Sequence, residues 1–351
     1  YLYGRVGEDH FVVIADEATF NEEYLYECRE TLQNVLSDSV YNVRVCFGIY
    51  RTDNMNESLS FMCDKASFAV ASIKDDTHSF IAYYDDTMLE AAIKYKTIVD
   101  EFDDAIKAGE FKMYLQPQIS AKTRRLTGAE ALVRRIKPDG TIISPIDFIP
   151  VYEKSGLISR LDRYIWEQAA AKLGEWKKAG INMSISVNIS PKDFYYIDIF
   201  NTFAGLIKKY DIEPSNLKIE ITETTIMSDV PNLMGELEEL RKAGFTLEMD
   251  DFGSGYSSLN TLKDINVDVL KVDMGFIKET KNVKKSRIIL ASVIKMAKEL
   301  NLLIITEGVE TEEQVDNLTK LGCDVFQGYY FSKAIDVNEF EKRYLYRKKA
   351  G

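Results

Sequence analysis

The sequence has few of the residues that build disulfide scaffolds or transition-metal sites. Its 351 residues include four cysteines and two histidines, and no two cysteines have CxxC spacing. Neither a disulfide framework nor a zinc site is therefore indicated, and we expect a reducing compartment such as the cytoplasm. No apolar run approaches the ~20 residues that a membrane-spanning helix needs, and no signal peptide pattern opens the chain. The chain begins with strand-like residues and without an initiator methionine. One open alternative is therefore an upstream sensor or membrane region, which would make this chain the cytosolic part of a membrane-anchored protein.

Positive charge is also in short supply. Lysine and arginine number 44 against 56 aspartate and glutamate residues, which gives a formal net charge of -12. This balance argues against a protein that binds nucleic acid polymers by counterion release, because that mode needs a basic surface. Small anions remain possible ligands where metals or local cations meet them. The 46% hydrophobic content suffices for two ordinary domains, or for one large α/β barrel with an attachment.

Hydrophobic periodicity divides the chain into two unequal parts. The first part predicts a hairpin that ends at residue 14, helices over 22–36 and 59–73, and a strand over 43–50. A helix that links the parts is predicted over 86–108, with Gly109 as its stop. Beyond it, short apolar strands alternate with amphipathic helices over 160–178, 200–210, 233–243, 286–300 and 312–321. The strands are predicted over 112–119, 126–134, 183–189, 217–222, 245–250, 268–273, 302–307 and 324–330.

Eight strands in such an alternation predict an α/β fold of the (β/α)8, TIM type. We therefore expect a partial α/β domain over 1–85, a linking helix over 86–108 and a barrel over 109–351. In barrels of this type, active sites gather at the carboxyl ends of the strands. Polar residues at the ends of the predicted strands are thus the candidates for chemistry.

The stretch FTLEMDDFGSGYSSL, residues 245–259, is the clearest of these ends. Its apolar residues alternate as in a strand, and Gly253 and Gly255 stop the strand directly after Asp250 and Asp251. Two readings stay open for this stretch alone: a solvated aspartate pair in a turn, or a site for chemistry.

Other strands end in the same way. Their polar or inward positions are Glu130, Leu132, Arg134, Asn188, Ser190, Glu220, Glu223, Lys271, Asp273, Glu307, Glu310 and Gln327. Carboxylates that end several strands of one barrel converge on a single mouth, where they repel each other unless a cation neutralises them. Acids and an amide without histidine or thiol suit a hard cation, Mg²⁺ or Mn²⁺. Two cations that share Asp250 would explain the adjacent acids, and paired metals are a device for displacement at phosphate.

These residues carry a resemblance to a known family. The chain resembles the EAL-domain cyclic di-GMP phosphodiesterases over about residues 91–351. The motifs occur in family order, as Gln116-Pro, Glu130-Ala-Leu132-Val-Arg134, Asn188-Ile-Ser190, Glu220-Ile-Thr-Glu223, Asp250-Asp-Phe-Gly253, Lys271-Val-Asp273, Glu307-Gly-Val-Glu310 and Gln327-Gly. One motif residue differs: Ser254 stands where the family often has threonine, and serine keeps the hydroxyl group.

The resemblance implies a role for each matched residue. One metal would be held by Glu130, Asn188, Glu220 and Asp250, and the other by Asp250, Asp251 and Glu307. Lys271 would position or activate the attacking water. The catalytic residues implied are Lys271, Glu130, Glu307 and Glu223. Substrate would be oriented by Gln116, Leu132, Arg134 and Gln327, with Arg134 facing a phosphate. Both cations would be Mg²⁺ or Mn²⁺, and Ca²⁺ is expected to inhibit because it accepts longer bonds and more ligands.

Three residues have competing interpretations. Glu223 follows Glu220 by three residues, so strand alternation predicts that it faces away from the metals and anchors the loop after Asp251 instead. Glu310 either joins the site or only caps the next helix with Thr311. Asp273 is either a partner of Lys271 or a surface acid.

The first part carries a second, damaged resemblance. Arg5-Val-Gly-Glu-Asp-His-Phe11, with the later Cys46-Phe-Gly48 and Asp64-Lys-Ala66, resembles the GGDEF family of diguanylate cyclases. Glu8 stands where that family has a second glycine, and His10 stands where it has a catalytic acid. Asp9 survives at a metal-type position. We therefore expect a fold fragment without cyclase activity, which has a regulatory role.

The expected function is metal-dependent hydrolysis of cyclic di-GMP to linear pGpG in bacterial second-messenger signalling, and the resemblance implies a homodimer through the barrel. One alternative is a catalytically silent cyclic di-GMP receptor, which would need the substrate contacts but not the metal ligands. Another is an unrelated acid-rich barrel enzyme of the enolase type, which would not need Arg134 and Gln327 beside an asparagine ligand. The retained metal set favours the enzyme.

Overall fold

The computed structural model divides into two compact units, residues 1–100 and 101–351. It describes residues 2–346 except for 8, 37–43, 53, 55, 75, 77, 229, 231, 253–261, 263–264 and 275–282. Within the described part of the chain, no helix is both long enough and apolar enough to cross a membrane.

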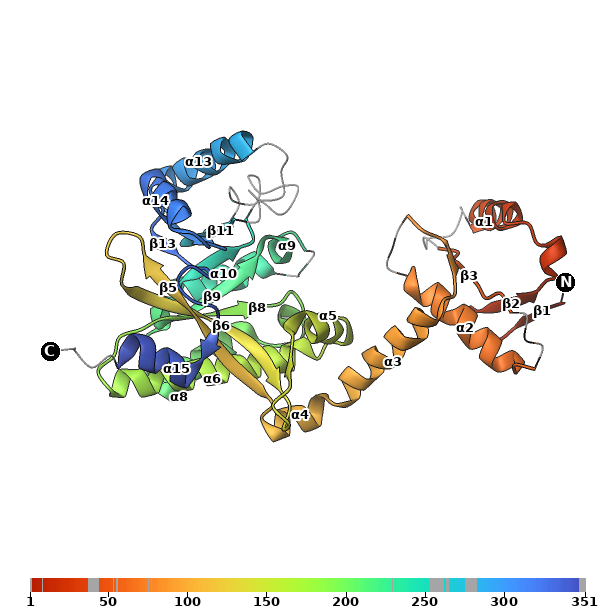
Figure 1. Cartoon of the computed structure of the whole chain (residues 1–351), viewed down its shortest axis with the longest axis horizontal. Coiled ribbons are helices and arrows are strands. Elements are labelled where there is room, and N and C mark those ends of the chain that lie inside the picture. Colours follow the sequence, from red (N-terminus) through yellow and green to blue (C-terminus); the bar gives the residue numbers. More distant parts are fainter. Residues whose placement is uncertain are drawn as a thin grey trace. The chain divides into compact units, whose positions relative to one another are not determined.

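The first unit is a small α/β assembly, drawn in red to orange in Figure 1. Strands β1 (Leu2–Arg5) and β2 (Phe11–Ile14) form an antiparallel hairpin. Strands β3 (Phe47–Ile49) and β4 (Ile81–Tyr83) pair in parallel. The described residues of the unit also form a 3-10 turn (Glu17–Thr19) and the helices α1 (Glu23–Leu36), α2 (Leu59–Ser72) and α3 (Asp86–Asp100).

The core of this unit forms where α2 crosses β3 and β4. It contains Ala69, Ile73 and Ala82. Gly48 allows the close approach, because a Cβ atom there would lie 2.0 Å from the carbonyl oxygen of Ala66. The predicted hairpin and both predicted helices are present, whereas the strand predicted over 43–50 is confined to β3. Residue 43 lies outside the described residues.

The second unit begins with α4 (Phe102–Ala108), which ends at Gly109 in the left-handed conformation, with φ 66°. The helix predicted over 86–108 is therefore two helices, α3 and α4, which Glu101 separates. Two ion pairs join the start of this unit to the barrel strand β6 (Leu126–Ile136). The Arg135 guanidinium contacts Glu101 at 2.7 Å and Glu110 at 2.9 Å.

The remaining strands close into the predicted eight-stranded barrel. Around the ring they follow the order β5, β6, β8, β9, β10, β11, β12 and β13, and β13 pairs with β5. Their bounds are β5 (Phe111–Ser120), β8 (Ile185–Ile189), β9 (Leu217–Thr222), β10 (Leu247–Asp250), β11 (Val269–Asp273), β12 (Leu303–Glu307) and β13 (Val325–Phe326).

The first strand departs from an all-parallel (β/α)8 arrangement. β5 runs antiparallel to both β6 and β13, whereas the pairings from β6 around to β13 are parallel. The reason is the connection, since a turn of a few residues leads from β5 to β6 and leaves no room for a crossover helix. Two short strands extend the sheet, β7 (Ile142–Ile143) beside β6 and β14 (Ile335–Asp336) beside β5.

Amphipathic helices cover the outside of the barrel, as Figure 1 shows for the green to blue part of the chain. They are α6 (Ile158–Lys178), α8 (Ile199–Tyr210), α10 (Leu233–Lys242), α13 (Val283–Glu299) and α14 (Glu312–Leu321). Capping fixes their ends, since Asp198 accepts a hydrogen bond from the Asn201 N–H at the start of α8, and Thr311 forms a capping box with Gln314 at the start of α14.

Further helical segments were not predicted from the sequence. They are α5 (Pro145–Ser155), α7 (Asp193–Tyr196), 3-10 turn 214–216, α9 (Glu223–Ile226), α15 (Val337–Phe340) and a π-helical turn (Glu341–Leu345). Most are shorter than two turns, too short for hydrophobic periodicity to reveal. α5 carries Pro150 in its interior, which disguises it in the sequence.

Candidate active site at the carboxyl ends of the strands

Lys271 is the centre of the candidate site. Its side chain is fully buried on β11, and its Nζ contacts carboxylates from four other strands. The distances are 2.7 Å to Glu307 on β12, 3.0 Å to Glu220 on β9, 3.4 Å to Asp250 on β10 and 3.6 Å to Glu130 on β6. Residues far apart in the sequence are thus brought to one point, as strand ends in a barrel require.

The charges in this cluster are unbalanced. Burial raises the pKa of Glu220 well above its usual value, and the charge of Glu130 raises it further. Burial, together with Asp250 and Glu130, raises the pKa of Glu307 to about 8 against the lowering effect of Lys271. The Lys271 pKa also lies well above its usual value, since the four carboxylates outweigh the effect of burial. One ammonium therefore does not compensate the acids, and a site of this kind favours additional cations.

A chain of amides runs along one side of the acids. Gln327 Nε2 donates to Gln116 Oε1 at 3.2 Å and also to Glu130. Gln118 Nε2 donates to Gln327 Oε1 at 3.2 Å, and Asn188 Nδ2 donates to Glu130 Oε1 at 3.4 Å. Gln118 is buried and was not singled out from the sequence. Its position two residues after Gln116, on the same face of β5, is the signal that would have identified it.

Asp250 and Asp251 occupy the end of β10, where the backbone changes direction. Asp251 has a φ of 56°, and its N–H donates to Asp250 Oδ1 at 2.8 Å. Burial and the neighbouring Asp250 raise the pKa of Asp251. The predicted strand end is therefore present. Gly253, Ser254 and Gly255, which follow it, lie outside the described residues.

The donor chemistry of the cluster fits a hard divalent cation. The expected ligands Glu130, Asn188, Glu220 and Asp250 all project from strands that meet at Lys271, and they offer only oxygen donors besides the amide nitrogen. Glu220 Oε1 is buried and accepts no hydrogen bond from the residues that the structure describes. Across those same residues, no group of three acid, histidine or cysteine side chains is placed to hold a metal ion. Glu307 and Glu220 contact the Lys271 ammonium, at 2.7 and 3.0 Å.

Leu132 and Arg134 continue along β6 beyond Glu130 and share its face. Leu132 pairs with Tyr114 of β5, and the Arg134 guanidinium lies 5.9 Å from the centre of the Tyr114 ring. Arg134 Nη1 donates to the carbonyl oxygen of Val133 at 2.7 Å. Both residues are partly buried and lie farther along the strand than the acids. This position is compatible with contact to a substrate above the carboxylates.

The three residues with competing interpretations, Glu223, Glu310 and Asp273, lie in different surroundings. Glu223 is fully buried at the start of α9, while the loop that it was predicted to anchor lies outside the described residues. At Glu310, the capping box belongs to Thr311 and Gln314, and Glu310 takes part through its backbone N–H, 2.7 Å from Gln314 Oε1. Asp273 is exposed at the end of β11, and the four ion pairs of Lys271 described above are with other acids.

The turn after β8 is fixed from behind. Trp166 on α6 donates from Nε1 to the carbonyl oxygen of Asn188 at 2.9 Å. Asp193, fully buried in the same turn, accepts from the Ser190 N–H at 2.8 Å. These contacts hold the end of β8, and hence Asn188, against the covering helix.

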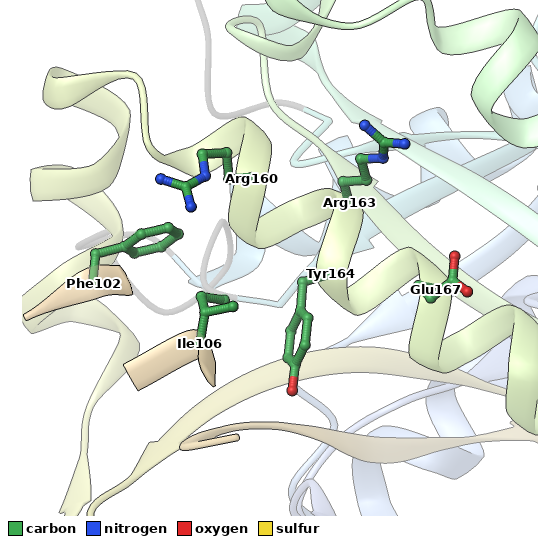
Figure 2. A pocket seen from close by; sticks show the side chains of 6 residues that line it. All are labelled: Phe102, Ile106, Arg160, Arg163, Tyr164 and Glu167. Carbon is green, nitrogen blue, oxygen red and sulfur yellow. The ribbon is translucent and has the colours of Figure 1, made fainter. Parts of the chain in front are cut away.

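A hollow of about 260 Å³ lies elsewhere on the second unit, between α4 and α6. Figure 2 shows its lining, in which the Arg160 side chain reaches toward Phe102 while Tyr164 and Glu167 point away from them. Arg160 Nη2 forms an ion pair with Asp103 Oδ1 at 2.5 Å, and its guanidinium lies 5.0 Å from the centre of the Phe102 ring. The carboxylate cluster contributes no residue to this hollow.

Comparison with known proteins identifies the barrel. The sequence matches the EAL domain over residues 99–334. The chain belongs to the EAL domain family. The matched residues lie almost wholly in the second unit, so the diguanylate cyclase resemblance of the first unit stays a prediction.

Relatives of the EAL barrel align over nearly the whole chain. The chain is 31% identical over 344 residues to the signaling protein YkoW of Bacillus subtilis. The aligned residues cover 96% of this chain and 43% of YkoW. It is 29% identical over 342 residues to the bifunctional diguanylate cyclase/cyclic di-GMP phosphodiesterase MucR of Pseudomonas aeruginosa. This alignment covers 95% of this chain and 50% of MucR. The chain thus spans half or less of the length of these relatives.

The EAL barrel also has solved structural neighbours. It is similar to the PaMucR phosphodiesterase in complex with c-di-GMP, with a TM-score of 0.65 and 32% sequence identity, over 70% of this chain and 99% of that one.

Proposed function

We propose that the EAL barrel is a metal-dependent phosphodiesterase that hydrolyses cyclic di-GMP to linear pGpG in bacterial signalling. The observation that carries the proposal is the convergence of Glu130, Glu220, Asp250 and Glu307 on the buried Lys271. The names of MucR and of the solved PaMucR complex support cyclic di-GMP as the substrate.

Two divalent cations, Mg²⁺ or Mn²⁺, would be held by the acids and Asn188. One would bind Glu130, Asn188, Glu220 and Asp250, and the other Asp250, Asp251 and Glu307. Such ions lower the pKa of a water molecule toward neutrality and offset charge on phosphoryl oxygens. Their charge would also offset the burial and the repulsion between neighbouring acids, which together raise the pKa values of Glu220 and Glu307.

The side chains around the acids would bind and orient the substrate. Arg134 offers a planar guanidinium with donors that match a phosphate, and it lies on the same face of β6 as Glu130. Gln116 and Gln327 present amides beside Glu130. The Lys271 ammonium would orient the attacking water, since it lies among the acids that would hold the metals.

The first experiment measures product formation by the whole chain. Cyclic di-GMP is incubated with the protein in Mg²⁺, Mn²⁺, Ca²⁺ or excess EDTA, and the products are separated by chromatography. We expect pGpG with Mg²⁺ or Mn²⁺, inhibition by Ca²⁺ and no product with EDTA. Glu130→Ala should abolish turnover, whereas the control Glu312→Gln, at the start of α14, should not. Undiminished hydrolysis in EDTA would contradict the proposal, and binding without turnover would indicate a silent receptor instead.

We further propose that the first unit is catalytically silent and regulates the barrel, and that the protein forms a homodimer through the barrel. Asp9, the surviving acid of the hairpin turn, lies 2.7 Å from His10 Nδ1 in an exposed position. An exposed contact of this kind is weak, so the proposal of a silent first unit is based on Glu8 and His10, which stand where the cyclase family has a glycine and a catalytic acid. Light scattering coupled to gel filtration measures the oligomeric state, and a monomer at micromolar concentration would contradict the dimer.

A further inference from the structure

Strands β5 and β6 place two positive charges opposite each other at the end of the hairpin beyond the acids. Lys112 of β5 is paired in register with Arg134 of β6. Residues directly opposite each other in an antiparallel pair share one face of the sheet, with Cβ atoms about 4.5–5.5 Å apart. By alternation along β5 this face also carries Gln116, which is paired with Glu130 of the carboxylate cluster. Lys112 therefore lies on the face of β5 that the site uses.

Neither of these two charges is neutralised within the described part of the chain. There Lys112 forms no ion pair and no hydrogen bond, and it is exposed. Arg134 donates to the carbonyl oxygen of Val133, and its guanidinium lies over the ring of Tyr114. Like charges directly opposite each other on neighbouring strands destabilise a sheet. The pair thus costs stability in a chain whose net charge is -12, where acids are in excess.

The nearest acids on the strands have other partners. Glu110, two residues before Lys112, contacts Arg135 at 2.9 Å on the side of β6 away from the site. Asp336 of β14 is paired with Tyr114, but its carboxylate accepts hydrogen bonds from the first turn of α15, at 3.0 and 3.1 Å. The two cations are therefore left for an anion from outside the chain.

We propose that Lys112 is a substrate-binding residue, which together with Arg134 holds the phosphate of cyclic di-GMP that is not cut. The inference rests on the proposed function and adds one residue to its substrate contacts. Arg134 lies four residues beyond Glu130, about 13 Å along the strand. The pair therefore meets a different part of the substrate from the phosphate at the metal ligands. A guanine base offers only neutral acceptors there, whereas a phosphate also neutralises both cations, as a guanidinium fork and a flexible ammonium allow.

The test is a calorimetric titration with cyclic di-GMP in Ca²⁺, so that binding is measured without turnover. Lys112→Met should weaken binding about tenfold, the usual loss for one hydrogen bond between charged groups. Lys112→Arg keeps the charge and should stay within about threefold of the unaltered protein. The control Lys178→Met removes another exposed lysine without an ion pair among the described residues, at the end of α6, and should change nothing.

Salt dependence separates a phosphate from a guanine base. Between about 50 and 200 mM salt, binding by the unaltered protein should weaken more steeply than binding by Lys112→Met, because salt screens a contact between a cation and a phosphate. A contact to the neutral guanine edge gives equal salt dependence for both proteins. Equal dependence would overturn the assignment to the phosphate.

Kinetics in Mg²⁺ and thermal melting distinguish a substrate contact from a structural role. Lys112→Met should raise the KM about tenfold and leave kcat within about twofold, since the uncut phosphate is bound alike before and during the reaction. Its melting temperature should stay unchanged or rise, because a repulsion is removed. Unchanged binding, a loss that Lys112→Arg does not restore, or a lowered melting temperature would each overturn the inference.

The same titration keeps this inference distinct from the proposed function. If the unaltered protein binds cyclic di-GMP without hydrolysing it, the proposed function fails, and the comparison of Lys112→Met with Lys112→Arg still decides the role of Lys112. If the unaltered protein does not bind cyclic di-GMP, both proposals fail.

Discussion

Lys271 is fully buried among four carboxylates at the carboxyl ends of the barrel strands. A buried ion pair returns little net stability, because desolvation of the charges offsets their attraction. Here a single buried ammonium faces four carboxylates. Burial and the charges of Asp250 and Glu130 raise the pKa of Glu307 to about 8, although Lys271 lowers it. The hydrophobic contacts of the barrel must hold this cluster together. Buried charged groups with shifted pKa values are typical of functional sites.

Glu223 gives the first prediction at the residue scale. If it anchors the loop after Asp251, Glu223→Ala should reduce hydrolysis strongly and raise the Mg²⁺ concentration for half-maximal rate by about 10- to 100-fold, the usual effect of losing support behind a metal ligand. Excess Mg²⁺ should restore part of the rate. The same excess should not rescue Asp250→Ala, which lacks a ligand shared by both metals. The measurement is a Mg²⁺ titration of both variants; a Glu223→Ala curve that matches the unaltered one would rule out the anchor.

Asp193 gives a prediction about pH. Burial raises the pKa of Asp193 to about 6. Asp193 faces Asp162 on α6, and burial together with the charge of Asp193 raises the pKa of Asp162 well above the usual range. The charge of Glu153 on α5 raises the pKa of both aspartates further. The unfolded value is about 3.9. Between about pH 4 and 6 the folded state therefore binds more protons than the unfolded state at this site, so the site loses stability as pH rises through that window.

Asp193→Asn should remove this loss, because an amide accepts from the Ser190 N–H and carries no charge. Its melting temperature relative to the unaltered protein should rise between pH 4 and pH 7 by a few degrees, about 2–4 °C for each kcal/mol in a domain of this size. The exposed Glu239→Gln on α10 is the control and should show no such trend. Calorimetry at four pH values measures both, and parallel curves for Asp193→Asn and the unaltered protein would contradict the raised pKa.

At the scale of elements, the long periodic segments were predictable and the short ones were not. Helices α6, α8 and α14 lie within two residues of their predicted starts and ends, because apolar spacing and capping residues act locally. The strand predicted over 324–330 is only β13, since Gly328 turns the chain immediately after Gln327. The antiparallel direction of β5 follows from the short turn that leads to β6, and the predicted strands over 112–119 and 126–134 already lie too close in sequence for a crossover helix.

Gly328 gives the prediction at this scale. Its φ is 156°, and a Cβ atom there would lie 2.2 Å from the carbonyl oxygen and 2.3 Å from the nitrogen of Val309. Gly328→Ala should therefore push the turn after β13 away from residue 309 and displace Gln327. We expect a destabilisation of several kcal/mol, about 4 or more, as backbone clashes give, and weaker binding of cyclic di-GMP.

The control is Gly205→Ala on α8, where a Cβ atom would meet nothing within 4 Å. That change should stabilise the protein by about 0.5–1 kcal/mol, because alanine loses less backbone entropy in a helix. Chemical denaturation measures both variants. Equal stability of Gly328→Ala and the unaltered protein would show that the two loops do not pack as closely as described.

At the scale of the whole molecule, the two units differ in what they are expected to do. We predict that the whole chain makes no cyclic di-GMP from GTP when the barrel is silenced by Glu130→Ala, since Glu8 and His10 replace residues of the cyclase turn. Chromatography after incubation with GTP and Mg²⁺ is the measurement. Detectable cyclic di-GMP would show that the first unit is an active cyclase.

Much of the site was visible in the sequence, because a barrel brings strand ends together whatever lies between them. Glu130, Glu220, Asp250, Lys271 and Glu307 were all expected at one mouth and meet there. Other buried polar residues were not foreseen. Strand alternation places Gln118 on the face of Gln116 and Glu248 on the face of Asp250. Their contacts, with Gln327 and with Lys218, depend on which strands are neighbours in the barrel.

The seam between β13 and β5 has a consequence for synthesis on the ribosome. It pairs Val325 with Ser120 and Phe326 with Ile119, and β14 then extends along the same edge of β5. Until Val325 has been made, β5 and β12 are open strand edges that hold most of the future interior between them. Unpaired edges of this kind are templates for aggregation. The nascent barrel is therefore most vulnerable just before its last strand emerges, and a chain interrupted there has no partner of its own for either edge.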